Sequence, residues 1–146
     1  MRKFANVCIV LGVIVLVASM ASYAIAQEWK TANQYVLTWD AVTTKTDGNP
    51  FSSGDVIEYT VFLVNAVTDP NKTNPVEVGT TAETTYTLTL NTEGKYFVGV
   101  RTNRTLVDDP DTTLTSEVAW SDDAGAAPTP FGVMSFLAPA APTGLR

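Results

Sequence analysis

The sequence has no histidine and a single cysteine, and only 16% of its 146 residues are charged. Without histidine the chain lacks the commonest general base and the commonest metal ligand of proteins. One cysteine forms neither an internal disulfide nor a thiolate metal site. Acidic residues outnumber basic ones by 15 to 9, and the resulting net charge of −6 disfavours binding to a phosphate backbone. These absences predict a protein that is not an enzyme, holds no metal or cofactor and binds no nucleic acid.

The N-terminus has the pattern of a targeting segment. Two of the first three residues are basic, and no charged residue follows until Glu28. Residues 7–17 are strongly apolar, and small residues follow up to Ala24-Ile25-Ala26. This layout predicts a secretory signal peptide over residues 1–26, cut between Ala26 and Gln27. The alternative is an uncleaved membrane anchor, because the uncharged run approaches the ~20 residues that span a bilayer.

Cleavage would leave 120 residues with no cysteine and a net charge of −8. We expect this chain to be secreted, or periplasmic, and to depend on a hydrophobic core rather than on disulfides. Its length supplies one such core. The composition divides it into a domain over residues 27–123 and a Pro/Ala-rich extension over residues 124–146.

Alternating apolar and polar residues predict short strands in most of the domain. Threonine occurs 22 times, and no stretch shows sustained helical periodicity. Period-two alternation marks residues 34–40, 56–64, 84–90, 95–102 and 116–120, with 76–78 as a short addition. Turn residues such as Asp47-Gly48-Asn49-Pro50 and Asn91-Thr-Glu-Gly94 separate these runs. The pattern predicts an all-β antiparallel sandwich or barrel.

One face of each run supplies the expected core. Its members are Leu37, Trp39, Tyr59, Val61, Tyr86, Leu88, Leu90, Tyr96, Val98, Val100 and Val118, with Trp120 on the same face as Val118.

At these residues the chain resembles a fibronectin type III domain, of the kind found in short exported bacterial and phage-associated proteins. The motifs that carry the resemblance are Leu37-Thr-Trp39-Asp40 for strand B, Val56-x-x-Tyr59-x-Val61 for strand C, Glu77-Val-Gly79 for strand C′, Thr85 to Leu90 for strand E, Tyr96-x-Val98-x-Val100 for strand F and Ser116-x-Val118 for strand G. The resemblance spans residues 34–121. It implies an immunoglobulin-like β-sandwich in which Tyr96 forms a tyrosine corner with the preceding loop.

Both ends of the domain depart from the family pattern. The family opens with a Pro-x-x-Leu strand A, and residues 27–33 contain no such motif. We therefore expect strand A to be short, displaced or missing, which would leave one sheet edge unpaired. At the other end, residues 131–137 form a further strand-like segment. Because the termini of this fold lie at opposite poles, we expect this tail not to supply its own domain's strand A, although it could reach that of a neighbouring molecule. The alternative is a flexible linker.

The resemblance implies that two long loops carry the binding site, since loops vary without disturbing the core. They are the B–C loop at 43–55 and the F–G loop at 103–115, with candidate residues Asp47, Asn49, Phe51, Asn103, Asp108, Asp109 and Asp111. Clustered aspartates attract calcium, but their spacing matches no EF-hand, and a solvated acidic loop is the preferred interpretation. The aromatic residues Trp29, Tyr35, Phe51, Phe62 and Phe97 lie outside the expected core, and packing is preferred over ligand binding for each.

Three functions are compatible with these features. The first is a secreted, non-enzymatic module that binds or adheres to an extracellular protein or polysaccharide. The alternative is a structural subunit that assembles head-to-tail by strand addition through residues 131–146. The third is an accessory domain of a hydrolase. A membrane partner is expected only if the N-terminal segment stays uncleaved.

Overall fold

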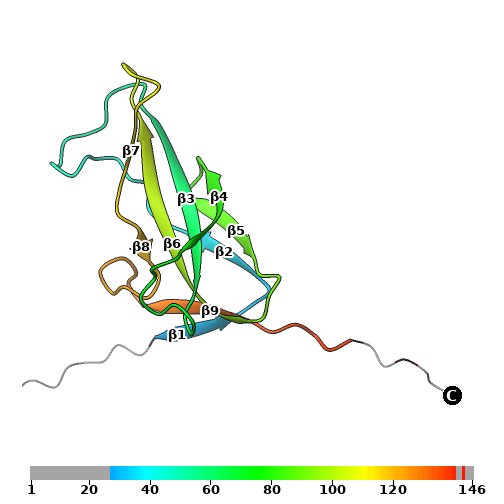
Figure 1. The fold of residues 1–146 in the computed structure, drawn as a ribbon. Coiled ribbons are helices and arrows are strands. Elements are labelled where there is room, and N and C mark those ends of the chain that lie inside the picture. The colour runs from blue at the N-terminus through cyan, green and yellow to red at the C-terminus, as the bar shows by residue number, and fades with distance from the viewer. Residues whose placement is uncertain (1–26, 141–142, 144–146) are drawn as a thin grey trace, which may run out of the picture.

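The computed structural model describes residues 27–140 and residue 143. This part of the chain forms nine strands and no helix (Figure 1). They are β1 (Glu28–Thr31), β2 (Gln34–Thr38), β3 (Val56–Asn65), β4 (Val76–Thr81), β5 (Thr85–Thr89), β6 (Gly94–Thr105), β7 (Thr113–Thr115), β8 (Ala119–Trp120) and β9 (Phe131–Ser135). The predicted signal peptide and its last residue, Ala26, lie outside the described residues. None of the described segments is a helix long and apolar enough to cross a bilayer.

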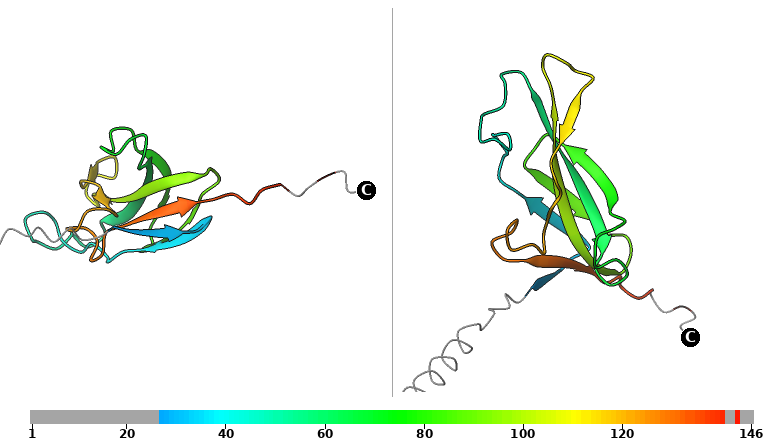
Figure 2. Two further views of the ribbon diagram at one scale, coloured as in Figure 1. Left: turned by 90° about the horizontal axis from the view of Figure 1, so that it is seen from below. Right: turned by 60° about the vertical axis from the view of Figure 1, so that its left-hand side comes forward.

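The strands form two sheets in a sandwich-like arrangement, so the predicted all-β sandwich is confirmed. The larger sheet has the order β1-β9-β6-β3-β4, and the smaller sheet consists of β2 and β5. One edge of β6 pairs in turn with β7, β8 and β9. All pairings are antiparallel except that of β1 with β9, which run in the same direction (Figure 2).

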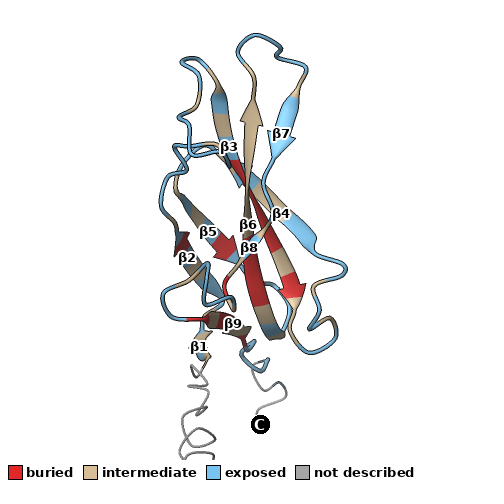
Figure 3. Cartoon of the chain, turned by 90° about the vertical axis from the view of Figure 1, so that its left-hand side faces the viewer, coloured by how far each residue is buried: buried red, intermediate tan, exposed pale blue. Residues whose placement is uncertain are grey.

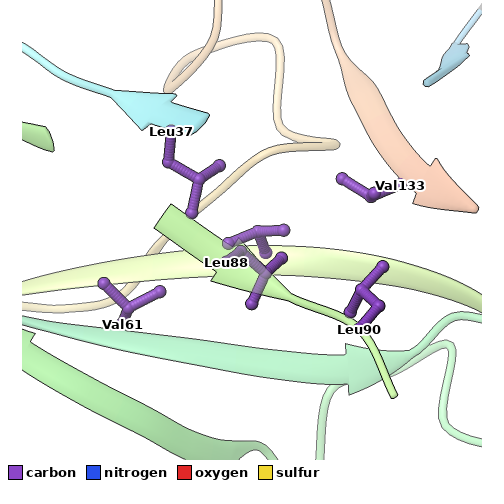
Figure 4. Close-up of a cluster of buried hydrophobic side chains, with 6 residues drawn as sticks. Leu37, Val61, Leu88, Leu90 and Val133 are labelled. Carbon is purple, nitrogen blue, oxygen red and sulfur yellow. The ribbon is translucent and has the colours of Figure 1, made fainter. Parts of the chain in front are cut away.

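The core lies between the sheets, at the end of the sandwich near β9. Leu37 of β2 and Leu88 of β5 meet Val61 of β3 and Val98 of β6, and Leu90 and Val133 complete the buried cluster (Figure 4). Buried residues lie in the half of β3 and β6 nearer β9, whereas β7 and the loops beyond it are exposed (Figure 3). Of the other expected core residues Tyr59 is buried, and Trp39, Tyr86, Tyr96 and Val100 are half-buried.

The outer face of the larger sheet also buries aromatic side chains. The alternation of apolar and polar residues in the sequence did not predict where these side chains lie. Phe62 and Phe97 are buried there, and the ring of Trp29 stacks on that of Phe97 with centroids 5.8 Å apart. The ammonium of Lys72 lies 5.3 Å from the centre of the Phe97 ring and 2.8 Å from the carboxylate of Asp122. The β3–β4 loop thus covers this face, and these aromatics are packing residues.

The expectation that Val118 and Trp120 face the inner core is wrong. Both side chains lie against Gly99 on the outer face, because Ala119 and not Val118 pairs with Val100. Successive residues of a strand point to opposite faces, so a pairing displaced by one residue exchanges the faces. Val118 is half-buried on the outer face instead of belonging to the core cluster.

The predicted C-terminal extension at residues 124–146 contains a strand of the same folded unit. After β8 the chain turns through residues 121–130 and returns to the same edge of β6, where Val133 pairs with Tyr96. The turn is closed by hydrogen bonds from Ser121 N–H to Val98 C=O (2.8 Å) and from Phe131 N–H to Ser121 C=O (2.7 Å). β9 contributes the fully buried Val133 to the core. The predicted boundary at residue 123 therefore cuts through the folded unit.

The residues before β2 form a short strand in a displaced position. β1 pairs with β9 of the larger sheet, and the chain crosses to the smaller sheet through Ala32 and Asn33. The second edge of β2 consequently has no partner strand in the described part of the chain.

Candidate functional site

Two loops lie side by side at the end of the sandwich away from β1 and β9. They are residues 39–55, between β2 and β3, and residues 106–112, between β6 and β7 (Figure 2, right). We call the surface that they share the tip surface. The long β3 and β6 strands carry both loops beyond the smaller sheet, because residues 56–58 and 103–105 extend the pairing of β3 with β6.

The carboxylate of Asp55 joins the two loops. It accepts a hydrogen bond from Arg104 Nε (2.6 Å), one from the Val107 N–H (3.1 Å) and one from the Ser52 N–H (3.0 Å). The Asp55 side chain is only 1% exposed. The Arg104 guanidinium also lies 5.4 Å from the centre of the Phe51 ring. One carboxylate therefore fixes Ser52, at the end of one loop, against Val107, at the start of the other.

Hydrogen bonding also determines the ionisation of Asp55. Burial raises the pKa of its carboxyl, but the hydrogen bonds from Val107, Arg104 and Ser52 outweigh burial and hold the pKa below its ordinary value. The group is thus an anion held by three donors, one of them a cation. Sequence analysis did not identify Asp55 or Arg104 as site residues. The sequence placed Asp55 in the predicted B–C loop and Arg104 in the predicted F–G loop, but no local pattern marked either residue.

Asp47 and Asn49 brace each other in a tight turn of the first loop. The Asp47 carboxylate accepts hydrogen bonds from the side-chain amide and from the backbone N–H of Asn49, both at 3.0 Å. The side-chain hydrogen bond from Asn49 is the main reason why the pKa of Asp47 lies below its ordinary value. Gly48 between them adopts a φ of +82°, which glycine tolerates best. Both side chains are exposed, so the turn presents them to solvent.

The predicted residues of the second loop separate into two groups. Asp108, Asp109 and Asp111 lie exposed in the loop, and Asp109 accepts a hydrogen bond from Thr112 Oγ1 (2.6 Å). Asn103 instead lies within β6, where its amide donates to Thr60 Oγ1 (2.7 Å). This interaction places Asn103 on the outer face of the sheet and apart from the loop. Among residues 27–140, no three Asp, Glu, His or Cys side chains are grouped to hold a metal ion.

A second feature is an open cleft of about 690 Å³ on the side of the sandwich. One wall of the cleft comes from β2 and the residues that follow it, and the other from the paired β6 and β8. Residues 126–128 close one end. Trp39 and Tyr59 meet edge-to-face in its wall, with ring centroids 5.3 Å apart. The Tyr59 hydroxyl accepts a hydrogen bond from the Val42 N–H (3.1 Å), whereas the buried Trp39 Nε1 has no partner among the described residues.

Comparisons of the chain with protein-family models, with curated proteins and with solved structures found no significant match.

Proposed function

We propose that this chain is an exported, non-enzymatic binding module of the fibronectin type III kind, whose tip surface binds an extracellular protein or polysaccharide. The observation that carries the proposal is the Asp55 carboxylate, which holds Arg104, Val107 and Ser52 together. Two loops fixed to each other lose less conformational entropy on binding than two independent loops. Binding residues are commonly found on loops that a rigid scaffold positions.

The strand order supports a fibronectin type III arrangement. β4, β3 and β6 follow the order of strands C′, C and F, and β2 with β5 that of strands B and E. β7 and β8 pair with the edge of β6 where strand G is expected, on either side of the Ser116-x-Val118 motif. The Tyr96 hydroxyl lies 3.3 Å from the carbonyl oxygens of Thr92 and Glu93, which is the contact of a tyrosine corner. The parallel pairing of β1 with β9 departs from the family pattern. Export is proposed from the apolar N-terminal segment alone.

The tip surface offers mainly acidic and amide groups. Asp47, Asn49, Asp108 and Asp111 are exposed, and Val107 adds an apolar contact between the loops. Carboxylates and amides accept hydrogen bonds from sugar hydroxyls and pair with basic protein side chains. Lys45 lies within the first loop, and Arg104, next to both loops, already interacts with Asp55. The acidic residues of the two loops outnumber these two cations. We therefore expect the partner to be neutral or basic, and its affinity to fall with salt if it is basic.

The test compares the tip with the opposite end of the same molecule. Residues 27–146 are screened on an array of cell-surface polysaccharides and extracellular matrix proteins. The tip variant replaces Asn49 and Phe51 by alanine and Asp108 and Asp111 by asparagine. The control variant replaces the exposed Val67 and Asn71 of the β3–β4 loop by serine.

We expect the tip variant to remain folded and to lose binding at least tenfold, and the control variant to retain binding. Equal binding by both variants, or no binding by the parent chain to any ligand on the array, would refute the proposed function.

Head-to-tail assembly through the tail requires a free donor strand. Residues 131–135 pair with β6 along one edge and with β1 along the other. Donation to a neighbour would require β9 to leave its own sheet and expose Val133. The segment after β9 reaches Pro139 within four residues, and proline does not donate to a strand ladder. We therefore place the binding function at the tip and not in the tail.

A further inference from the structure

One edge of β2 pairs with β5, and its other edge is free of any described strand. Hydrogen bonds from Trp39 N–H to Thr84 C=O (3.1 Å) and from Leu90 N–H to Asn33 C=O (2.7 Å) fix which residues of β2 bond to β5. In an antiparallel pair these alternate, so Asn33, Tyr35, Leu37 and Trp39 direct their backbone groups toward β5. The N–H and C=O groups of Gln34, Val36 and Thr38 therefore point away from β5, to an edge that no described strand covers.

The cleft opens directly beside this edge. Leu37, Thr38 and Trp39 belong both to β2 or its end and to the cleft wall. The facing wall is apolar and comes from Val98 and Val100 of β6 and from Ala119 of β8, with Pro128 and Phe131 at one end. Asp40 and Glu117 are the charged lining residues among the described part of the chain, and both are exposed acids.

We infer that this edge and cleft together bind an extended cationic peptide segment, which adds to the smaller sheet as a third strand next to β2. Residues of the added strand opposite Val36 would exchange backbone hydrogen bonds with it, as an edge strand allows. Residues opposite Tyr35 and Leu37 would point to the inner face, where the cleft accepts apolar side chains. The buried Trp39 Nε1–H, which has no partner among the described residues, would meet an acceptor on the added strand.

Charge favours a peptide with lysine or arginine at its ends. Asp40 and Glu117 lie at the cleft without a lining cation to neutralise them, and the whole chain carries a net charge of −6. A second copy of this chain fits the cleft less well. Its β2 strand would place Tyr35 and Leu37 in its own core, so the cleft would stay empty. The site is distinct from the tip surface, because the two share only Trp39, Asp40 and Val42, at the start of the first loop.

The probe is a capped seven-residue peptide, Lys-Val-Thr-Val-Thr-Val-Lys, titrated into residues 27–146. Backbone amide resonances and the Trp39 indole N–H are followed by NMR. We expect shifts at Gln34, Val36 and Thr38 and at the Trp39 indole. The control peptides carry glutamate at both ends or N-methyl groups on alternate backbone amides, and each should bind at least tenfold more weakly.

Two proline variants test which edge of the smaller sheet binds the peptide. Val36→Pro removes a backbone N–H that points to the free edge, and leaves the hydrogen bonds of β2 to β5 intact. Thr87→Pro is the matched control, since Thr87 pairs with Val36 and its N–H points to the far edge of β5. We expect Val36→Pro to abolish peptide binding and Thr87→Pro to retain it, with both variants folded by their amide spectra.

The variant Asp40→Lys/Glu117→Lys changes only exposed side chains and keeps the inference testable if a proline variant does not fold. It should weaken binding at least tenfold. The inference is overturned if the peptide binds Val36→Pro or the lysine variant as tightly as the parent chain, or if its shifts map to residues 43–55 and 106–112. It is also overturned if the parent chain sediments as a dimer that Val36→Pro dissociates, because a second copy would then occupy the edge.

Discussion

At the scale of the residue, three tyrosine hydroxyls tie the strands to loops and to each other. Tyr86 donates to the Val78 carbonyl (2.8 Å), Tyr59 accepts from the Val42 N–H (3.1 Å), and Tyr96 reaches the turn before β6. In each case the ring packs toward the sandwich and the hydroxyl satisfies a backbone group that no strand pairs. Each tyrosine therefore combines apolar packing of its ring with a hydrogen bond from its hydroxyl, and phenylalanine provides only the packing.

Gly79 is required by one of these contacts. The strand pairing shifts between Val61 and Phe62 opposite this glycine, and a Cβ there would overlap the Tyr86 hydroxyl and lie 3.0 Å from Tyr86 Cζ. We expect Gly79→Ala to lower the free energy of unfolding by about 1–3 kcal/mol, because overpacking forces the ring to move. Tyr86→Phe alone should cost about 0.5–1.5 kcal/mol for its hydrogen bond.

Urea denaturation of the two single variants and the double variant checks this explanation. In the Tyr86→Phe background the alanine should cost less than it does alone, since the overlapping oxygen is gone. Strict additivity of the two changes would show that the close approach to Tyr86 is not the reason for the glycine.

At the scale of the element, β9 is the strand that joins β1 to the rest of the larger sheet. It is the partner of β1, it continues the edge of β6, and it buries Val133 completely. We expect Val133→Ala to cost about 1.5–3 kcal/mol, the value of a fully buried valine side chain. Phe136→Ala, one residue beyond β9 and 60% exposed, is the matched control and should change stability by less than about 0.5 kcal/mol.

Thermal or urea unfolding of the two variants measures the difference. Equal stability of both would mean that β9 is not part of the cooperative unit. A chain ending at residue 130 should likewise unfold more readily while remaining monomeric. A soluble polymer formed by the full chain, and abolished by this truncation, would instead support a donor role for the tail.

The same elements show how far the sequence determined the fold. The strands β2, β3, β5 and β6 were predictable. Each alternates over five or more residues, and an Asn or Asp stands at its end or soon after it. The pairing along the edge of β6 was not predictable. This edge is covered by three short strands, and the loop at 121–130 decides that residues 131–135 return to it. Because Ala119, and not Val118, pairs with Val100, Val118 and Trp120 lie on the face opposite to the predicted one.

At the scale of the whole molecule, the tip surface depends on contacts that a local pattern does not contain. Asp55 and Arg104 are 49 residues apart in sequence, and pairing of β3 with β6 brings them together. From their turn residues and their acids, sequence reasoning selected two loops that the fold brings side by side. It did not find the pair that joins them, and it included Asn103, which lies on the outer face. A site that depends on strand register becomes visible only with the fold.

The aspartates that organise the loops make stability depend on pH. Hydrogen bonds hold the pKa of Asp55, Asp47 and Asp69 below the ordinary value; at Asp69 the main donors are the backbone N–H groups of Thr73 and Asn74. A carboxyl whose pKa is lower in the folded than in the unfolded chain stabilises the fold fully above the unfolded value of about 4. That contribution is lost as the pH falls through the lower pKa of the folded state.

We therefore expect the urea midpoint to be flat from pH 7 to about pH 5 and to fall steadily below about pH 4. In Asp55→Asn the midpoint at pH 7 should be lower and the acid decline shallower, because the buried charge that holds Arg104 and Val107 is gone at every pH. Asp108→Asn, at an exposed position of the adjacent loop, is the matched control and should keep the parent profile. A parent-like profile in Asp55→Asn would mean that the two loops are held together without this carboxylate.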